Sequence, residues 1–422
     1  MNKTQSAVIA AFRQTQSDSA PKAAHAALEA PSTLLPGVHI TVVDSLAVVE
    51  TLWRRFEADA DCTVFQDFDY LAAWQKHIGA RAHVAPVIAI VRRGAETLAI
   101  LPLALSKSGL TRRLTWLGQE LCDYLAPLLA RDFAQSIDAA RFAGLWREIL
   151  ALMHRDARFR HDLVELRKMP AVVGGQPNPF LALPVNPNPS SAHLTALTGD
   201  WETFYTEKRS ASTRRRDRTK RKRLGESGEV RMVTPHEDGE IVRTLETLIR
   251  QKSAALKRMG VADLFAAPGV RDFYLDLVTH PRTRGVVHIS RLDIGALPAS
   301  VNLGLQFRGR YHYILASYDD GEISRFGPGA AHLRDLMAYA IEQGCREFDF
   351  TIGDERYKFE WSDTETKLYD YVAASTLRGW PAAFLLNALT RAKRTIKQNP
   401  AFWAAFQQLR TAAGALRRSP PS

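Results

Sequence analysis

The stretch spanning residues 324–361 constrains the fold most, because it places a turn, a helix and a strand in direct succession. Residues 327–329 read Gly-Pro-Gly, and apolar positions at helical spacing follow them up to a helix-ending Gly344. Residues 348–352 then alternate like a strand, and 353–358 form a polar loop. A glycine turn that opens a helix suits an anionic ligand, and an acid-bearing strand before an ionisable loop suits acid–base chemistry.

Similar elements precede this stretch in both halves of the chain. In the second half we predict helices at 238–259 and 270–279 and strands at 286–293, 299–307 and 310–317. In the first half we predict a hairpin of 85–92 with 97–105, a strand at 113–117, a helix at 137–153 and a strand at 163–166. The shared order predicts an α/β (α+β) protein with two tandem domains, each a mixed, mainly antiparallel sheet flanked by helices.

Composition shifts mark the expected boundaries of these domains. We expect a disordered lead at 1–33, a first domain at 34–168, a Pro-, Gly- and Asn-rich linker at 169–199, a second domain at 200–375 and a helical tail at 376–422.

The formal charge of +11 is concentrated in two segments. Residues 208–223 contain ten basic residues and one acidic residue, and residues 371–422 contain eight basic residues and no acidic one. The first segment predicts a helix whose charges are either solvated or in contact with phosphates, acidic polysaccharide, anionic lipid or RNA. No aromatic residue interrupts the segment, which argues against nucleic acid as its partner. The tail predicts helices at 380–396 and 400–416, which either pack on the body or lie at a membrane interface.

Other features limit the compartment and the chemistry. The three cysteines are isolated and odd in number, and the histidines lack ligand spacing, so we expect neither a disulfide framework nor a metal site. No apolar run is long enough to span a bilayer, and the N-terminus is not a convincing signal peptide. We therefore expect a cytoplasmic protein, with peripheral contact at the inner face of the cell membrane through its basic tail.

The element order resembles the GNAT acyltransferase fold, and particular motifs resemble the CelD/BcsL family. These motifs are Tyr311–Tyr313, the Pro328-Gly329 turn, Phe348–Phe350, Gly353-Asp354 and Tyr357-Lys358. That family of bacterial acetyltransferases is associated with the synthesis of cellulose and other exopolysaccharides, and it is related to the Fem peptidyltransferases. The resemblance implies two GNAT-like domains, of which 200–375 is the acyltransferase domain, with acetyl-CoA or another acyl-CoA as co-substrate.

The chemistry and placement of individual residues predict their roles in such a transfer. The turn supplies the donor-binding residues Arg325, Gly327, Gly329 and Ala330. It departs from the usual GNAT pattern, since Ser324 stands at its first position and Pro328 removes one N–H donor. The expected catalytic residues are Asp349, Tyr357 and Glu355, and the expected acceptor-binding residues are Tyr313, Tyr318, Asp354 and Lys358. Each also has a structural interpretation, such as an ion pair for Asp349 or core packing for the tyrosines.

Three functions follow as hypotheses. The first is transfer of an acyl group, most simply acetyl, from acyl-CoA to an amine or hydroxyl of a polysaccharide or envelope precursor. Transfer would be direct, in a ternary complex, because no Cys or Ser nucleophile stands out. The second is a Fem-like transferase that uses aminoacyl-tRNA. The third is a catalytically degenerate scaffold for exopolysaccharide synthesis.

Overall fold

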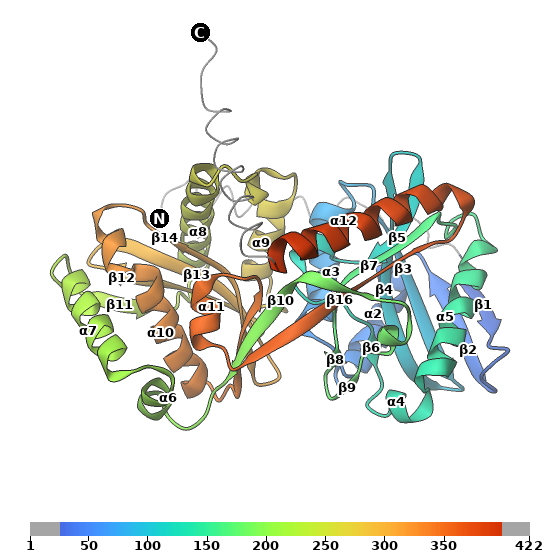
Figure 1. Ribbon diagram of the computed structural model, residues 1–422, viewed down its shortest axis with the longest axis horizontal. Coiled ribbons are helices and arrows are strands. Elements are labelled where there is room, and N and C mark those ends of the chain that lie inside the picture. Colours follow the sequence, from blue (N-terminus) through green and yellow to red (C-terminus); the bar gives the residue numbers. More distant parts are fainter. Residues whose placement is uncertain (1–25, 399–422) are drawn as a thin grey trace, which may run out of the picture.

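The computed structural model describes residues 26–398, whose strands build one large sheet flanked by helices (Figure 1), apart from a separate two-stranded sheet at residues 172–177. The strands are β1 (Leu28–Pro31), β2 (Val38–Val43), β3 (Ala85–Arg93), β4 (Glu96–Ser108), β5 (Thr111–Trp116), β6 (Leu128–Leu129), β7 (Leu163–Pro170), β8 (Val172–Val173), β9 (Gln176–Pro177), β10 (Asn186–Ala196), β11 (Val230–Val233), β12 (Val287–Ile294), β13 (Leu297–Phe307), β14 (Arg310–Tyr318), β15 (Glu347–Ile352) and β16 (Thr364–Ala374). The α-helices are α2 (Leu46–Glu57), α3 (Phe68–Trp74), α4 (Phe133–Ser136), α5 (Ala139–His154), α6 (Trp201–Lys208), α7 (Ala211–Gly225), α8 (Asp238–Arg258), α9 (Val270–Thr279), α10 (Pro328–Glu342), α11 (Arg356–Trp361) and α12 (Trp380–Gln398).

The sheet runs through both halves of the molecule in the order β1-β2-β3-β4-β5-β7-β16-β10-β15-β14-β13-β12-β11, with β6 beside β4. Its pairs are antiparallel except for β5 with β7 and β14 with β15, which are parallel. The predicted fold class, a mixed and mainly antiparallel sheet flanked by helices, is therefore confirmed, although the strands form one continuous sheet instead of two separate ones.

Each half repeats one pattern around its parallel pair. In the first half the antiparallel strands β3, β4 and β5 precede α5, and β7 then returns parallel to β5. In the second half β12, β13 and β14 precede α10, and β15 returns parallel to β14. The two halves differ in the link between the three antiparallel strands and the helix. In the second half a glycine turn opens α10, whereas in the first half α5 begins more than twenty residues after β5 and has no such turn.

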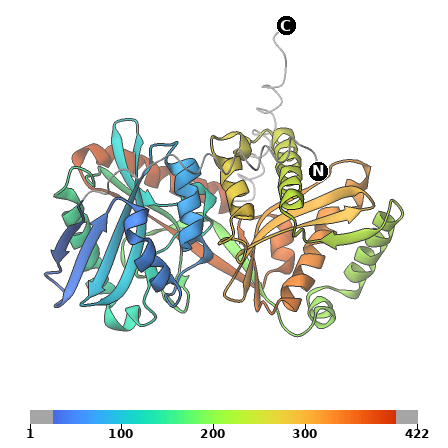
Figure 2. The same cartoon turned by 180° about the vertical axis from the view of Figure 1, so that it is seen from behind.

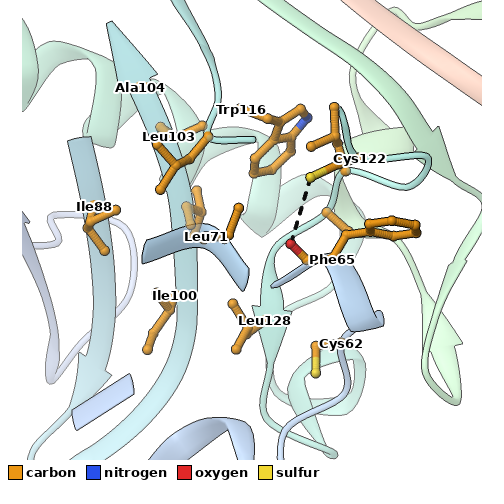
Figure 3. Close-up of a cluster of buried hydrophobic side chains, with 14 of the residues drawn as sticks. Cys62, Phe65, Leu71, Ile88, Ile100, Leu103, Ala104, Trp116, Cys122 and Leu128 are labelled. Atoms are coloured by element: carbon orange, nitrogen blue, oxygen red, sulfur yellow. Dashed lines mark hydrogen bonds between the residues drawn. The ribbon is translucent and has the colours of Figure 1, made fainter. Parts of the chain in front are cut away.

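The core of the first half is apolar and well filled. Trp53, Trp116 and Trp146 are among its largest fully buried side chains. Figure 3 shows part of this core, in which the Cys122 side chain points toward the Phe65 carbonyl. Cys62, Cys122 and Cys345 are all buried and free, so they act as small packing residues in this fold.

The second half carries helices on both faces of its sheet (Figures 1 and 2). On one face, Leu245 and Leu248 of α8 and Phe273 of α9 belong to the large apolar cluster that includes Val301 and Leu303. On the other face, α10 buries its Leu333, Leu336 and Met337 in a separate cluster with Tyr311 and Phe348. This layering leaves the ends of β14 and β15 between α8 and α10.

Three sequence expectations differ from the structure. Part of the expected lead forms β1, which pairs with β2, while residues 1–25 lie outside the described residues. The expected linker contains β10, which pairs with β15 and β16 in the middle of the sheet. The expected polar loop at 353–358 contains the start of α11.

The first helix of the tail is present as α12, which packs against β7, β10 and β16. The second predicted tail helix, at 400–416, lies outside the described residues. Among the described helices, none combines the length and the apolarity that crossing a membrane requires.

Candidate active site

The parallel strands β14 and β15 separate after only three residue pairs. Their pairing joins Arg310 to Glu347, Tyr311 to Phe348 and His312 to Asp349, and it stops there. β14 continues along β13 to Tyr318, while β15 continues along β10. Beyond this point, next to the turn that opens α10, the two backbones no longer pair, although the Thr351 hydroxyl still donates to the Tyr313 carbonyl at 3.4 Å.

Two local distortions accompany this separation. Ile314 has no partner between the pairs Leu303–Leu315 and Gly304–Tyr313, so β14 contains a bulge. Thr351 has a φ of 59°, which is unusual for a β-branched residue. The Thr351 N–H donates to Oδ1 of Asp349 at 2.8 Å, so a side chain replaces the missing strand as its acceptor.

The turn that opens α10 presents backbone donors. Gly327 adopts a φ of 69°, which favours glycine, and Pro328 occupies the first helical position. The N–H groups of Gly329 and Ala330 have no acceptor one turn earlier in the helix. A Cβ placed on Gly329 would meet the Tyr318 ring at 3.5 Å, an ordinary contact, so Tyr318 and Gly329 lie together.

Positive charge lies close to this turn. The Lys220 ammonium of α7 lies 3.9 Å from the position that a Cβ on Gly327 would take. The exposed Arg325 guanidinium packs over the Phe326 ring, 4.9 Å from its centroid. Together with the positive end of the α10 dipole, these groups form a setting that favours an anion.

Contacts with α10 hold the basic helix α7 in place. Arg221 pairs with Asp335 at 2.9 Å, and Arg334 pairs with the buried Asp217 at 3.4 Å. Leu224 is fully buried at the end of the helix. The basic side chains that have no acidic partner among the described residues include Arg215, Arg216, Arg218, Lys220 and Lys222.

Ionisable side chains from α8 and α11 gather beyond the strand separation. The Lys252 ammonium of α8 donates to the Ala316 carbonyl of β14 at 3.1 Å. The buried Lys358 donates to the Ile352 carbonyl at 2.8 Å and pairs with Glu355 at 3.0 Å. Burial lowers the pKa of Lys252 and the nearby Lys358 lowers it further, while Glu355 opposes the shift. The charges of α8 and α11 therefore act on one another across this space.

Two tyrosines complete this group. The rings of Tyr313 and Tyr357 meet edge to face, with centroids 6.3 Å apart. Burial raises the pKa of both phenols, and the charge of Glu355 raises the pKa further. Both tyrosines are therefore protonated at neutral pH and are able to donate a proton or a hydrogen bond.

Asp349 lies apart from this group, in the contact between the two halves. It is fully buried, and besides the Thr351 N–H its Oδ1 accepts the Tyr124 hydroxyl of the first half at 2.7 Å. Its Oδ2 has no hydrogen-bond partner, although Arg310 Nη1 lies 3.6 Å away. Burial raises the pKa of this carboxyl, and the Arg310 charge opposes that shift.

The structure thus brings some predicted site residues together and separates others. Tyr313, Glu355, Tyr357 and Lys358 form one group, and the residues of the turn that were expected to bind the donor form a second with Tyr318. Asp349 is buried away from the surface, while Asp354 is exposed at the start of the loop. Within the described residues, no cluster of three or more His, Cys, Asp or Glu side chains is arranged to hold a metal ion.

Sequence reasoning missed Lys252 and the first-half contact of Asp349. Lys252 did leave a signal, because it interrupts the apolar stripe of α8 that includes Leu245, Leu248 and Leu256. Tyr124 belongs to an Asp123-Tyr124 motif that fits the family resemblance, but the sequence does not indicate its contact with Asp349, which depends on pairing between distant strands.

Comparison with known families addresses the second half directly. Residues 211–359 match the family model of the acetyltransferase (GNAT) domain. The matched segment starts at the basic helix α7 and includes the α10 turn, the strand separation and most of α11. GNAT domains generally use an acyl-CoA and an acceptor, so the match supports an acyltransferase-type domain. No curated protein sequence matches this chain.

Comparison with solved structures extends the likeness beyond the second half of the chain. The crystal structure of FemX has a TM-score of 0.53 at 10% identity, and the match covers 76% of this chain and 96% of FemX. L-PGS from Bacillus licheniformis has a TM-score of 0.48 at 14% identity, covering 81% of this chain and 96% of that one. A tandem GNAT protein of the clavulanic acid biosynthesis pathway has a TM-score of 0.44 at 12% identity, covering 79% and 98%. At these identities the likeness to FemX shows a shared fold that includes part of the first half.

Proposed function

We propose that the protein is an acyl-CoA-dependent acyltransferase that transfers an acyl group, most simply acetyl, to an amine or hydroxyl of a polysaccharide or cell-envelope precursor. One observation supports this most strongly. β14 and β15 separate beside a helix N-terminus that carries two free N–H groups and a neighbouring lysine. An acyl-CoA whose pyrophosphate contacts the turn would then place its thioester at the ends of both strands.

The donor-binding role falls to residues around the turn. The N–H groups of Gly329 and Ala330 would donate to the pyrophosphate, and Gly327 gives the chain the left-handed conformation that the turn requires. Pro328 removes one donor, and we propose that the Lys220 and Arg325 charges compensate for it.

The chemical step would use the group beyond the separation. The acceptor amine must lose a proton, and the departing thiolate must gain one. The exposed Glu355 is our candidate base, and the protonated Tyr357 is our candidate acid. Lys252 and Lys358 would hold an anionic part of the acceptor, and the Tyr313 ring would support the Tyr357 ring that it contacts. Acyl transfer would then be direct, without a covalent enzyme intermediate.

Asp349 takes a different role in this proposal from the one its sequence context predicts. Its carboxylate is buried and already accepts two hydrogen bonds, from Tyr124 and Thr351. We therefore propose that Asp349 is a positioning residue, which fixes the end of β15 and thereby the loop that carries Glu355.

Calorimetric titration with acetyl-CoA tests the donor site. Wild-type protein should bind saturably, and Gly329→Glu should weaken binding by roughly tenfold or more, because it places a carboxylate against the phosphates. A Glu in the first turn of a helix favours the helix itself, so loss of binding would not reflect unfolding. Gly175→Glu is the matched control, since a Cβ at that exposed position meets nothing within 4 Å. Equal binding by the three proteins would contradict the proposal.

A Fem-like transferase that takes its group from aminoacyl-tRNA is the second candidate. Five exposed basic residues of α7 favour it, because they have no acidic partner among the described residues: Arg215, Arg216, Arg218, Lys220 and Lys222. Binding of tRNA but of no acyl-CoA would establish this alternative. Binding of neither would favour a degenerate scaffold.

We also propose peripheral contact with the inner face of the cell membrane through the basic C-terminal segment, whose described part is α12. This contact would bring the transferase to an envelope precursor at the membrane surface.

A further inference from the structure

We infer that the start of α12 and the tip of the β4–β5 hairpin together form a docking surface for an anionic phospholipid bilayer. The hairpin contains no residue that the sequence had marked as a membrane contact, and it lies more than 250 positions before α12 in the chain. The inference therefore depends on what the fold brings together.

The most exposed large apolar side chains of the described residues all belong to this surface. Leu377 is 93% exposed, Leu110 92%, Phe384 68%, Trp380 65% and Leu385 57%. Trp380 and Phe384 stack on each other, with ring centroids 6.2 Å apart. Apolar groups this exposed are costly in water when they gather in one place, so such a patch indicates a contact surface.

Asp162 joins the hairpin to α12. Its carboxylate accepts the Arg112 N–H near the tip of the hairpin at 3.0 Å and the Thr376 hydroxyl at 2.8 Å. Its carbonyl lies so close to Gly379 that no Cβ would fit there. Leu110 is two residues from Arg112, and Leu377 and Trp380 flank Gly379, so the exposed side chains lie at one corner. Figure 1 shows the hairpin rising beside the start of α12.

The charge of this surface selects a membrane over an apolar protein partner. Arg378, Arg391 and Lys393 are exposed, as is Lys107 in the hairpin. No acidic residue occurs from position 371 onward, and the Asp162 carboxylate is engaged by the two hydrogen bonds above. Tryptophan and phenylalanine next to unpaired cations are the side chains that interfacial helices use on anionic lipid.

The opposite face of α12 fixes the helix in this orientation. Ala383 and Thr390 are buried against the sheet. Asn387 accepts from Asn186 at 3.1 Å and donates to the Val372 carbonyl at 3.4 Å. The apolar side chains of the outer face therefore remain outside whether or not a membrane is present.

This surface deepens the membrane contact proposed above, and it does not depend on acyl transfer. Loss of vesicle binding with retained acetyl-CoA binding would count against the docking surface alone. Loss of acetyl-CoA binding with retained vesicle binding would count against the acyltransferase alone.

Co-sedimentation of the full chain with vesicles tests the inference. The protein should bind phosphatidylcholine vesicles that contain phosphatidylglycerol, and it should bind pure phosphatidylcholine much more weakly. Trp380→Ala/Phe384→Ala should reduce partitioning by roughly tenfold, and Leu110→Ala by roughly threefold. Val48→Ala is the matched control, because Val48 is an apolar helical residue that is 55% exposed on α2; it should bind like wild type.

Several results would overturn the inference. One is the absence of binding to either vesicle type. Another is binding that Leu110→Ala and the double variant leave unchanged, which would place the contact elsewhere, including residues 399–422. A third is a wild-type dimer in solution that the double variant converts to a monomer, since the surface would then serve a second copy of this chain.

Discussion

At the scale of single residues, Asp349 connects the fold to the proposed chemistry. Its Oδ1 accepts from both Tyr124 and Thr351, so one carboxylate joins the two halves and ends the pairing of β14 with β15. Leaving a buried partner of such a bond unsatisfied typically costs about 1–3 kcal/mol. We therefore expect Asp349 to affect turnover by holding β15 and the following loop in place.

Asp349→Ala should therefore keep acetyl-CoA binding and lower turnover by about tenfold or more, because it removes the acceptor of both hydrogen bonds and the loop that carries Glu355 loses its fixed anchor. The measurement is kcat and KM alongside the calorimetric Kd for acetyl-CoA. Tyr124→Phe removes only one of the two hydrogen bonds and should have a smaller effect in the same direction. Unchanged turnover in Asp349→Ala would remove this residue from the mechanism.

The spatial arrangement of the expected site residues was only partly predictable from the sequence. Glu355, Tyr357 and Lys358 were identified because they adjoin a distinctive motif, and the structure places them together with Tyr313. The burial of Asp349 was not predictable, since it depends on Tyr124 from the other half. Local sequence reports which face of a strand a side chain occupies, whereas long-range pairing decides what covers that face.

At the scale of elements, α7 positions its charges through its contacts with α10. The Arg221–Asp335 and Arg334–Asp217 pairs orient the helix, and Lys220 then lies beside the Gly327 turn. Lys222 is two positions further along, so it points away from the side of the helix that carries Lys220.

Lys220→Ala should weaken acetyl-CoA binding by about three- to tenfold, and added salt should reduce the difference from wild type. Lys222→Ala is the matched control, since it removes the same charge from the same helix. Titrations of both variants at low and high ionic strength provide the measurement. If both variants bind equally well, Lys220 has no specific role at the turn.

Helices and strands with strong periodicity were predicted almost to the residue, as α8 (238–258) and α9 (270–279) show. β10 was missed because its prolines and asparagines resemble a linker, yet its strand pairing resumes at Ser191 after a break in register. α11 was missed because six residues with three charges carry too little periodicity to mark a helix.

At the scale of the whole molecule, β10 and β16 make the sheet continuous between the halves. His77 and Lys76 of the first half add a contact to Asp276 of α9, at 2.7 and 3.0 Å. Burial alone would raise the pKa of Asp276, but these two partners hold it at about 2. We therefore expect one cooperative unfolding transition, and calorimetry that resolved two separate transitions would contradict this expectation.

Acid should destabilise the fold partly through His288. Burial lowers the pKa of this histidine to about 4, while its two ring nitrogens contact Tyr311 and Thr234. The unfolded chain binds this proton below pH ~6.5, so stability is present above that pH and is lost as pH falls toward 4. Glu57 works in the opposite direction, because burial raises its pKa to about 8.

Comparing wild type with a His288 variant separates the contribution of this histidine to acid sensitivity from that of groups such as Glu57. His288→Gln removes the titrating group. The difference in free energy of unfolding between wild type and this variant should therefore shrink by about 2 kcal/mol as the pH falls from 7 to 5. Urea unfolding of both proteins at the two pH values measures this change. A deficit that is the same at both pH values would show that His288 does not contribute to acid sensitivity.

Hydrogen exchange with and without acetyl-CoA tests the central claim most directly, because it reports where the ligand acts on the chain. The account predicts slower exchange in peptides that cover Gly327–Leu333 and Tyr313–Tyr318, with little change in the β2–β5 sheet of the first half. Protection confined to the first half, or no protection at either segment under saturating ligand, would contradict an acyl-CoA site where β14 and β15 separate.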